Sequence, residues 1–96
     1  MILHTVKTSP FQTLAIVDCL ALMAEQDTLL LIEDAVIAAQ AKHASSEQLA
    51  LLSEQGRLMV LDADLLARGI QNNIGKVCSY TDFVKLVVQH KSQIAW

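Results

Sequence analysis

The stretch Thr28–Glu33 reads TLLLIE, with four large apolar residues in a row between a threonine and a glutamate. An uninterrupted apolar run is typical of a parallel strand covered on both faces, whereas a strand with one wet face alternates apolar and polar residues. The segment that follows, DAVIAAQAKH from Asp34, predicts a short helix. A covered strand followed by a helix indicates a βαβ unit, so this stretch favours an α/β fold.

The same alternation runs through the rest of the chain. Strands are predicted at residues 1–7, 57–62, 76–80 and 92–96, and further helices at 10–25, 45–56, 63–69 and 82–91. We therefore expect a three-layer α/β/α sandwich around a mainly parallel sheet of about five strands, with right-handed crossovers. No repeat, low-complexity segment or linker divides the chain, which predicts a single domain over residues 1–96.

Helix starts are predicted from capping residues, among them a capping box formed by Ser45 and Gln48. Ser9 and Gln12 are spaced as a capping box around Pro10, which suits the first helical position. Asp64 is placed to cap the helical turn that follows the third strand. Thr81 is predicted to cap the last helix.

The composition indicates a protein that binds other proteins. Hydrophobic residues make up 53% of the chain and charged residues 18%, which is more apolar surface than a small domain readily buries. The longest apolar run, Cys19–Ala24, is far shorter than the roughly 20 residues of a membrane-spanning helix, and no signal-peptide pattern is present. The helix predicted at 10–25 is apolar on nearly all sides. We expect a soluble, cytoplasmic, oligomeric protein with no membrane contact.

Three kinds of site are disfavoured. Direct nucleic-acid binding usually needs a basic stripe, whereas this chain has a net charge of −3 and scattered lysines and arginines. The first strand–helix turn, KTSPF, lacks the glycines of a phosphate-binding loop. His4, His43 and His90 show no metal-ligand spacing, so no metal and no other cofactor is expected. His4 is interpreted as a hydrogen-bonded core histidine, and His90 as a residue in the last turn of the last helix.

The two cysteines are the candidates for thiol chemistry. Cys78 lies in a predicted buried strand, where a free cysteine behaves as a small apolar residue. Cys19 lies about ten residues into the first predicted helix, too far from its N-terminus for the dipole to lower the thiol pKa. Asp18 beside it also opposes a thiolate. The residues alone favour an inert Cys19, but a thiol that exchanges sulfur with a partner tolerates weak activation, so both interpretations stay open.

Four stretches carry a resemblance that covers nearly the whole chain. They read ILHTVKTSPF (2–11), LLLIEDAVIAA (29–39), VLDADLLARG (60–69) and YTDFVKLVVQHKSQIAW (80–96). In these stretches the chain resembles the TusB/DsrH family. The resemblance implies a DsrE-like α/β/α fold and a cytoplasmic heterohexamer formed with TusC-like and TusD-like subunits.

The resemblance also implies a function. TusB-like proteins serve a relay that passes persulfide sulfur from a TusA-like carrier to a TusE-like acceptor for 2-thiolation of the tRNA wobble uridine. DsrH-like proteins occupy the same place in a sulfur-oxidation complex. Cys19 matches a cysteine of DsrH-like chains, which makes it a candidate catalytic residue as a persulfide carrier. Some TusB-like chains lack this cysteine and are architectural, so that role stays open, as does a stand-alone homo-oligomeric thiol enzyme.

Overall fold

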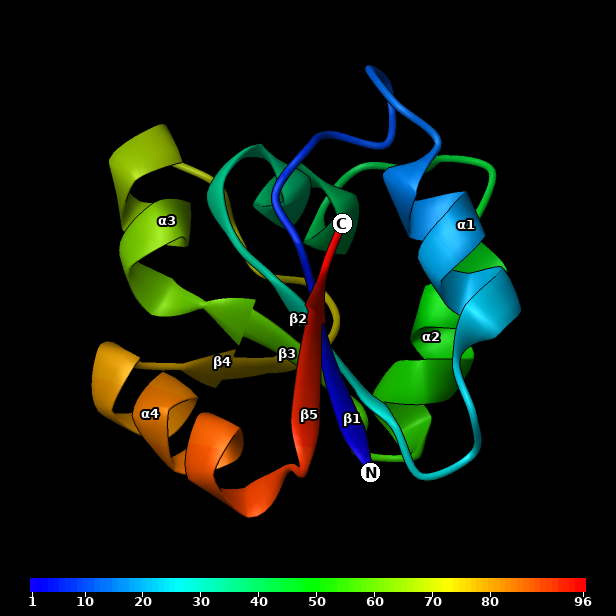
Figure 1. Ribbon diagram of the computed structural model, residues 1–96. Helices are drawn as coiled ribbons and strands as arrows, with labels where there is room; N and C mark the ends of the chain where they lie inside the picture. Colours follow the sequence, from blue (N-terminus) through cyan, green and yellow to red (C-terminus); the bar gives the residue numbers. More distant parts are fainter.

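The computed structural model describes residues 1–96 and contains a five-stranded, all-parallel sheet with the order β4-β3-β2-β1-β5 (Figure 1). The strands are β1 (Ile2–Val6), β2 (Thr28–Leu31), β3 (Leu58–Leu61), β4 (Lys76–Cys78) and β5 (Ser92–Ala95). All five lie within the segments that the sequence predicts as strands. The predicted α/β fold is confirmed, and the sheet is parallel throughout.

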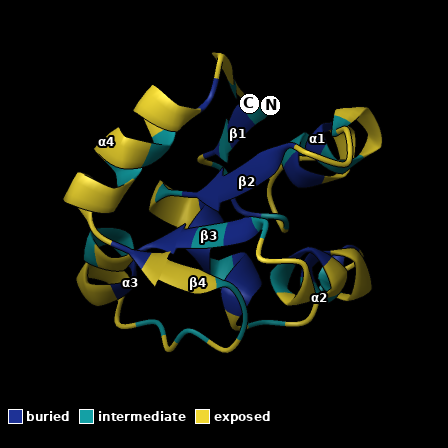
Figure 2. Ribbon diagram, turned by 90° about the horizontal axis from the view of Figure 1, so that it is seen from below, coloured by how far each residue is buried: buried dark blue, intermediate teal, exposed yellow.

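The helices form the outer layers. They are α1 (Ala15–Leu22), the 3₁₀ helix η1 (Glu33–Ala39), α2 (Ser46–Glu54), α3 (Asp62–Arg68) and α4 (Tyr80–Gln89). α1 and α2 cover one face of the sheet and α4 covers the other, which gives the expected three layers (Figures 1 and 2). α3 follows β3 directly and packs against η1. None of the helices has both the length and the apolar character needed to cross a lipid bilayer.

The core is distributed unequally between the two faces of the sheet. Every residue of β2 is buried, as its apolar sequence predicts (Figure 2). The cluster that includes residues of α1, η1 and α2 has 14 buried members, whereas the cluster beside α4 has four: Leu3, Leu30, Leu61 and Cys78. The face under α4 is therefore thinly covered.

The first helix begins later than predicted. Ser9 Oγ accepts a hydrogen bond from the amide of Phe11 at 3.1 Å, so the serine closes a local turn instead of forming a capping box with Gln12. The helix starts at Ala15, whose amide donates to Thr13 Oγ1 at 3.3 Å, and is only eight residues long. The predicted start at Ser9 is wrong because the serine side chain bonds to the backbone two residues on, and this turn replaces a helical one.

Other caps also differ from the prediction, and Ser45, although it precedes α2, makes no side-chain cap bond. Ser79, not Thr81, caps α4: Ser79 Oγ accepts from the Asp82 amide and Asp82 Oδ2 accepts from the Ser79 amide, both at 3.1 Å. Asp64 lies inside α3, which already begins two residues earlier. Its Oδ2 accepts from the amide of Glu33 at 2.7 Å, so Asp64 caps the start of η1, a different helix.

The tail after β5 returns to the first strand. The amide of Trp96 donates to the carbonyl of Thr5 at 2.9 Å, and its indole Nε1 lies 3.1 Å from His4 Nδ1. His4 is 1% exposed, and its Nε2 lies 2.9 Å from Asp27 Oδ2. The interpretation of His4 as a hydrogen-bonded core residue is confirmed.

His90 joins the end of α4 to the sheet. It follows the last residue of α4 and is buried, although the sequence places it inside the last helical turn. Its Nδ1 donates to the Leu86 carbonyl at 2.7 Å, and its Nε2 lies 3.0 Å from Thr28 Oγ1. Its contacts therefore hold the C-terminal end of α4 against β2.

Candidate functional site

Cys19, the candidate persulfide carrier, lies on the inner side of α1. Its side chain is completely buried within the larger core cluster, together with Ile16 of the same helix. Burial, and to a smaller extent the negative charge of Asp27, raise the pKa of the Cys19 thiol to about 12. At neutral pH Cys19 is therefore a protonated thiol that is shielded from solvent in this conformation.

The carboxylate of Asp27 is held by hydrogen bonds. Oδ1 accepts from the Ile2 amide at 3.0 Å, and Oδ2 accepts from the Ala24 amide at 3.0 Å and from His4 Nε2 at 2.9 Å. Burial acts to raise the pKa of Asp27, but these bonds outweigh it and lower the pKa to about 2. A carboxylate of such low basicity is not a general base for Cys19, so the surroundings supply no group that would activate the thiol.

The outer side of α1 is apolar as well. Leu14, just before the helix, is 68% exposed, and Val17 and Leu22 are 43% and 59% exposed. The prediction that the first helix is apolar on more than one side is confirmed. One side faces the core, and the other offers apolar surface to solvent.

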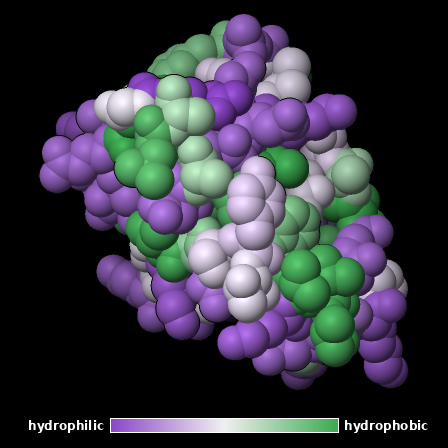
Figure 3. Space-filling view, turned by 90° about the vertical axis from the view of Figure 1, so that its left-hand side faces the viewer, coloured by the Kyte–Doolittle hydropathy of each residue, from purple (hydrophilic) through white to green (hydrophobic).

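A second apolar face lies on α4. Its exposed members are spaced at i, i+4, i+7 and i+8, which places them on one side of the helix: Tyr80, Val84, Val87 and Val88. Hydrophobic side chains gather over α4 at the lower right of Figure 3. We call these four residues the α4 stripe. Contiguous exposed apolar side chains of this kind mark protein-binding surfaces.

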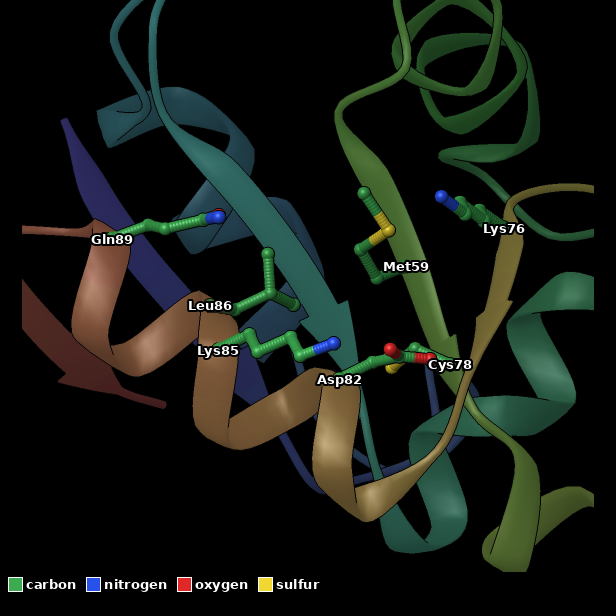
Figure 4. A pocket seen from close by; sticks show the side chains of 7 residues that line it. All are labelled: Met59, Lys76, Cys78, Asp82, Lys85, Leu86 and Gln89. Carbon is green, nitrogen blue, oxygen red and sulfur yellow. The ribbon is translucent and has the colours of Figure 1, made fainter.

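Cys78 borders a cleft of about 180 Å³ between α4 and the strands β3 and β4 (Figure 4). The cleft is lined by Met59, Lys76, Cys78, Asp82, Lys85, Leu86 and Gln89. Cys78 itself is 3% exposed, which confirms its interpretation as a buried strand residue. Burial first, then the charges of Asp82 and Asp62, raise the pKa of its thiol to about 11, and Lys76 acts in the opposite direction.

The cleft was not predicted, although its pattern is present in the sequence. Lys76 and Cys78 are two apart in a strand and so share a face of the sheet. Asp82, Leu86 and Gln89 recur at helical spacing on one side of α4. The side chains of the strand and those of the helix form one site only because the fold places α4 over β4.

A wider depression lies between the β1–α1 loop, η1 and α3, and ligands of parallel α/β folds commonly bind near the carboxyl ends of the strands. It measures about 490 Å³ and contains one cation, Arg68. That guanidinium is already paired, with Asp34 Oδ1 at 3.0 Å and Asp64 Oδ1 at 3.2 Å. Elsewhere, no three His, Cys, Asp or Glu side chains are grouped to hold a metal ion.

Comparison with known proteins agrees with the resemblance found in the sequence. Residues 8–93 match the family described as DsrH like protein. The chain is 43% identical to Protein TusB of Erwinia tasmaniensis, over 98% of this chain and 99% of that protein. It is 39% identical to Protein TusB of Escherichia coli K12 and of Shigella boydii, over the same shares of the chains. Because the family match covers residues 8–93, which include elements on both faces of the sheet, this chain belongs to the DsrH-like family.

Proposed function

We propose that this chain is a subunit of a sulfur-relay complex that serves 2-thiolation of the tRNA wobble uridine. In this complex sulfur travels as a persulfide from a TusA-like carrier to a TusE-like acceptor. The partners in the assembly are a TusC-like and a TusD-like subunit, together forming a heterohexamer in the cytoplasm. Membership of the DsrH-like family and the similarity to proteins named TusB support the proposal.

The observation that carries the proposal is the α4 stripe. Val84 and Val88 are 63% and 80% exposed, although apolar side chains of this size gain free energy when they are buried. The exposed apolar side of α1 lies across the sheet from it (Figure 1). Apolar surface on two opposite sides suits a subunit that contacts more than one neighbour.

Within the complex, the burial of Cys19 favours an architectural role for this chain over that of a persulfide carrier. Its sulfur lies in the core beneath α1, so a partner thiol reaches it only if α1 moves away from the sheet. The absence of an activating base at Cys19 also argues against a stand-alone thiol enzyme. In the architectural role, the relay cysteine belongs to the TusD-like subunit.

Assembly is tested by coexpression with the TusC-like and TusD-like chains. Size-exclusion chromatography with light scattering should show one complex of about six subunits. The double variant Val84→Asp, Val88→Asp should fail to enter it, since two charges would be buried in the interface. Leu66→Asp is the matched control, because Leu66 of α3 is 75% exposed and lies outside the stripe. A parent chain that stays monomeric with these partners, or a stripe variant that assembles normally, contradicts the proposal.

The role in thiolation is tested in cells that lack the gene for this chain. Nucleoside mass spectrometry should show loss of 2-thiouridine from tRNA and its recovery with the parent chain or the Leu66→Asp control. Retention of 2-thiouridine together with a defect in sulfur oxidation would favour the DsrH-type complex instead. The match of residues 8–93 to the family described as DsrH like protein supports that alternative.

Persulfide mapping tests the role of Cys19. The assembled complex is incubated with a persulfidated TusA-like carrier, and mass spectrometry assigns each added sulfur to a cysteine. We expect sulfur on the TusD-like subunit and none on Cys19, with tRNA thiolation unaffected by Cys19→Ala. Sulfur on Cys19, together with loss of thiolation in Cys19→Ala, would establish it as a carrier and overturn the architectural role.

A further inference from the structure

Two lysines flank the cleft beside Cys78. Lys76 extends from β4 and Lys85 from α4, on opposite sides of the cleft (Figure 4). Neither lysine takes part in an ion pair, since the ion pairs of the structure involve His4 and Arg68. Two ammonium groups and a single carboxylate, that of Asp82, leave an excess of positive charge on this small cleft, which is suited to a bound anion.

One acidic group of the lining offsets one of the two lysine charges. Asp82 is the one acidic residue in the lining, and its carboxylate accepts from the Ser79 amide as part of the helix cap. Asp62 acts on Cys78 but does not line the cleft. The Cys78 thiol is neutral at physiological pH, because burial raises its pKa to about 11. The lining therefore carries one net positive charge, from two lysines and one aspartate.

The floor of the cleft is apolar and rich in sulfur. Met59 of β3 lies near Lys76, and Leu86 of α4 lies beside Lys85 on the side toward Gln89 (Figure 4). Gln89 adds an amide at the end of α4. The volume of about 180 Å³ corresponds to about six water molecules at roughly 30 Å³ each. A ligand of five or six non-hydrogen atoms fits this space.

We propose that this cleft binds a small anion with charged oxygen atoms at one end and a sulfur atom or short apolar group at the other. The ammonium groups of Lys76 and Lys85 hold the oxygen end. Met59 and Leu86 contact the other end, because a polarisable sulfur or a methyl group gains dispersion energy there that a hydrated oxygen does not. The site is independent of the proposed relay function, so neither result decides the other.

The test compares two probe anions, thiosulfate and sulfate, on the full chain. Both have five atoms and a charge of −2, so they differ mainly in the sulfur that replaces one oxygen. Amide chemical shifts are followed by NMR at constant ionic strength. We expect saturable shifts at Lys76, Cys78 and Leu86, with thiosulfate binding at least fivefold more tightly than sulfate.

Lysine variants distinguish a specific anion-binding site from a general effect of the protein's charge. Lys76→Gln and Lys85→Gln should each weaken thiosulfate binding at least fivefold, and both lysines are exposed, so the fold should be retained. Lys91→Gln is the matched control, because Lys91 is exposed and lies outside the cleft. Equal affinity for the two anions, no saturable shift, or an equal effect of all three variants would overturn the proposal.

Discussion

The indole nitrogen of Trp96 donates a hydrogen bond to Nδ1 of His4 across 3.1 Å, joining residues 92 positions apart in the sequence. An indole N–H can only donate, so His4 Nδ1 accepts and the ring proton is on Nε2. His4 Nε2 then donates to Asp27 Oδ2 at 2.9 Å. The tail residue therefore fixes the tautomer of a buried histidine, which in turn orients the carboxylate of Asp27.

Trp96→Phe should lower the free energy of unfolding by about 1 kcal/mol, because it keeps an aromatic ring but leaves His4 Nδ1 without its donor. The measurement is urea denaturation at pH 7. Phe11→Leu, at a 61% exposed ring outside this network, is the control and should stay near the parent. Equal stability of Trp96→Phe and the parent would show that the indole bond contributes nothing.

Asp27→Asn should change the pH dependence of stability. The pKa of Asp27 falls from 3.8 to about 2 on folding, so its charged form stabilises the fold above about pH 4, and this contribution is lost as the pH falls to 2. This lowering of the pKa corresponds to about 2 kcal/mol. The unfolding free energies of parent and variant should differ most above pH 5 and converge toward pH 2. A gap that stays constant between pH 2 and 6 would be inconsistent with the low pKa.

Ser79→Ala should destabilise the protein by about 1 kcal/mol, because it removes the side-chain acceptor for the Asp82 amide. Thr81→Ala is the matched control, since Thr81 is exposed and Ser79 is the N-cap. Thermal unfolding followed by circular dichroism compares the two. If Thr81→Ala costs as much as Ser79→Ala, the cap has been assigned to the wrong residue.

Cys19 should react very slowly with iodoacetamide in the folded protein. With a thiol pKa of about 12, only about one molecule in 10⁴ is a thiolate at pH 8, and the side chain is buried as well. Mass spectrometry of tryptic peptides should show alkylation of Cys19 in 8 M urea but little under native conditions. Rapid alkylation of Cys19 in the folded protein would mean that α1 readily moves away from the sheet. That result would support Cys19 as a persulfide carrier.

The strands were predictable because their apolar runs have no competing local structure. TLLLIE, for example, can bury a continuous apolar surface only between two helical layers. The caps were less predictable, since several side chains near each helix start could accept the same amides. Ser9 bonds to Phe11 and Asp64 bonds to Glu33, an interaction between residues 31 positions apart. The first is a choice between two local hydrogen bonds of one serine, and the second depends on tertiary structure.

The candidate sites also have some features that the sequence predicts and others that depend on the tertiary structure. The burial of Cys78 follows from its place in a strand, and the apolar character of α1 follows from its sequence. The complete burial of Cys19 depends on which side of α1 faces the sheet, which an all-apolar helix does not reveal. The two lysines of the cleft come together only because α4 crosses over β4 on its way to β5.

The position of β1 between β2 and β5 has a consequence for synthesis on the ribosome. Ile2–Thr5 are made some 90 residues before their partners in β5, Ser92–Ala95. Until those residues emerge, the outer edge of β1 has unpaired amides and carbonyls, and open strand edges promote pairing with other chains. The folding of β1 therefore depends on delayed pairing with β5, and defects in residues 92–96 should reduce the yield of folded protein during expression.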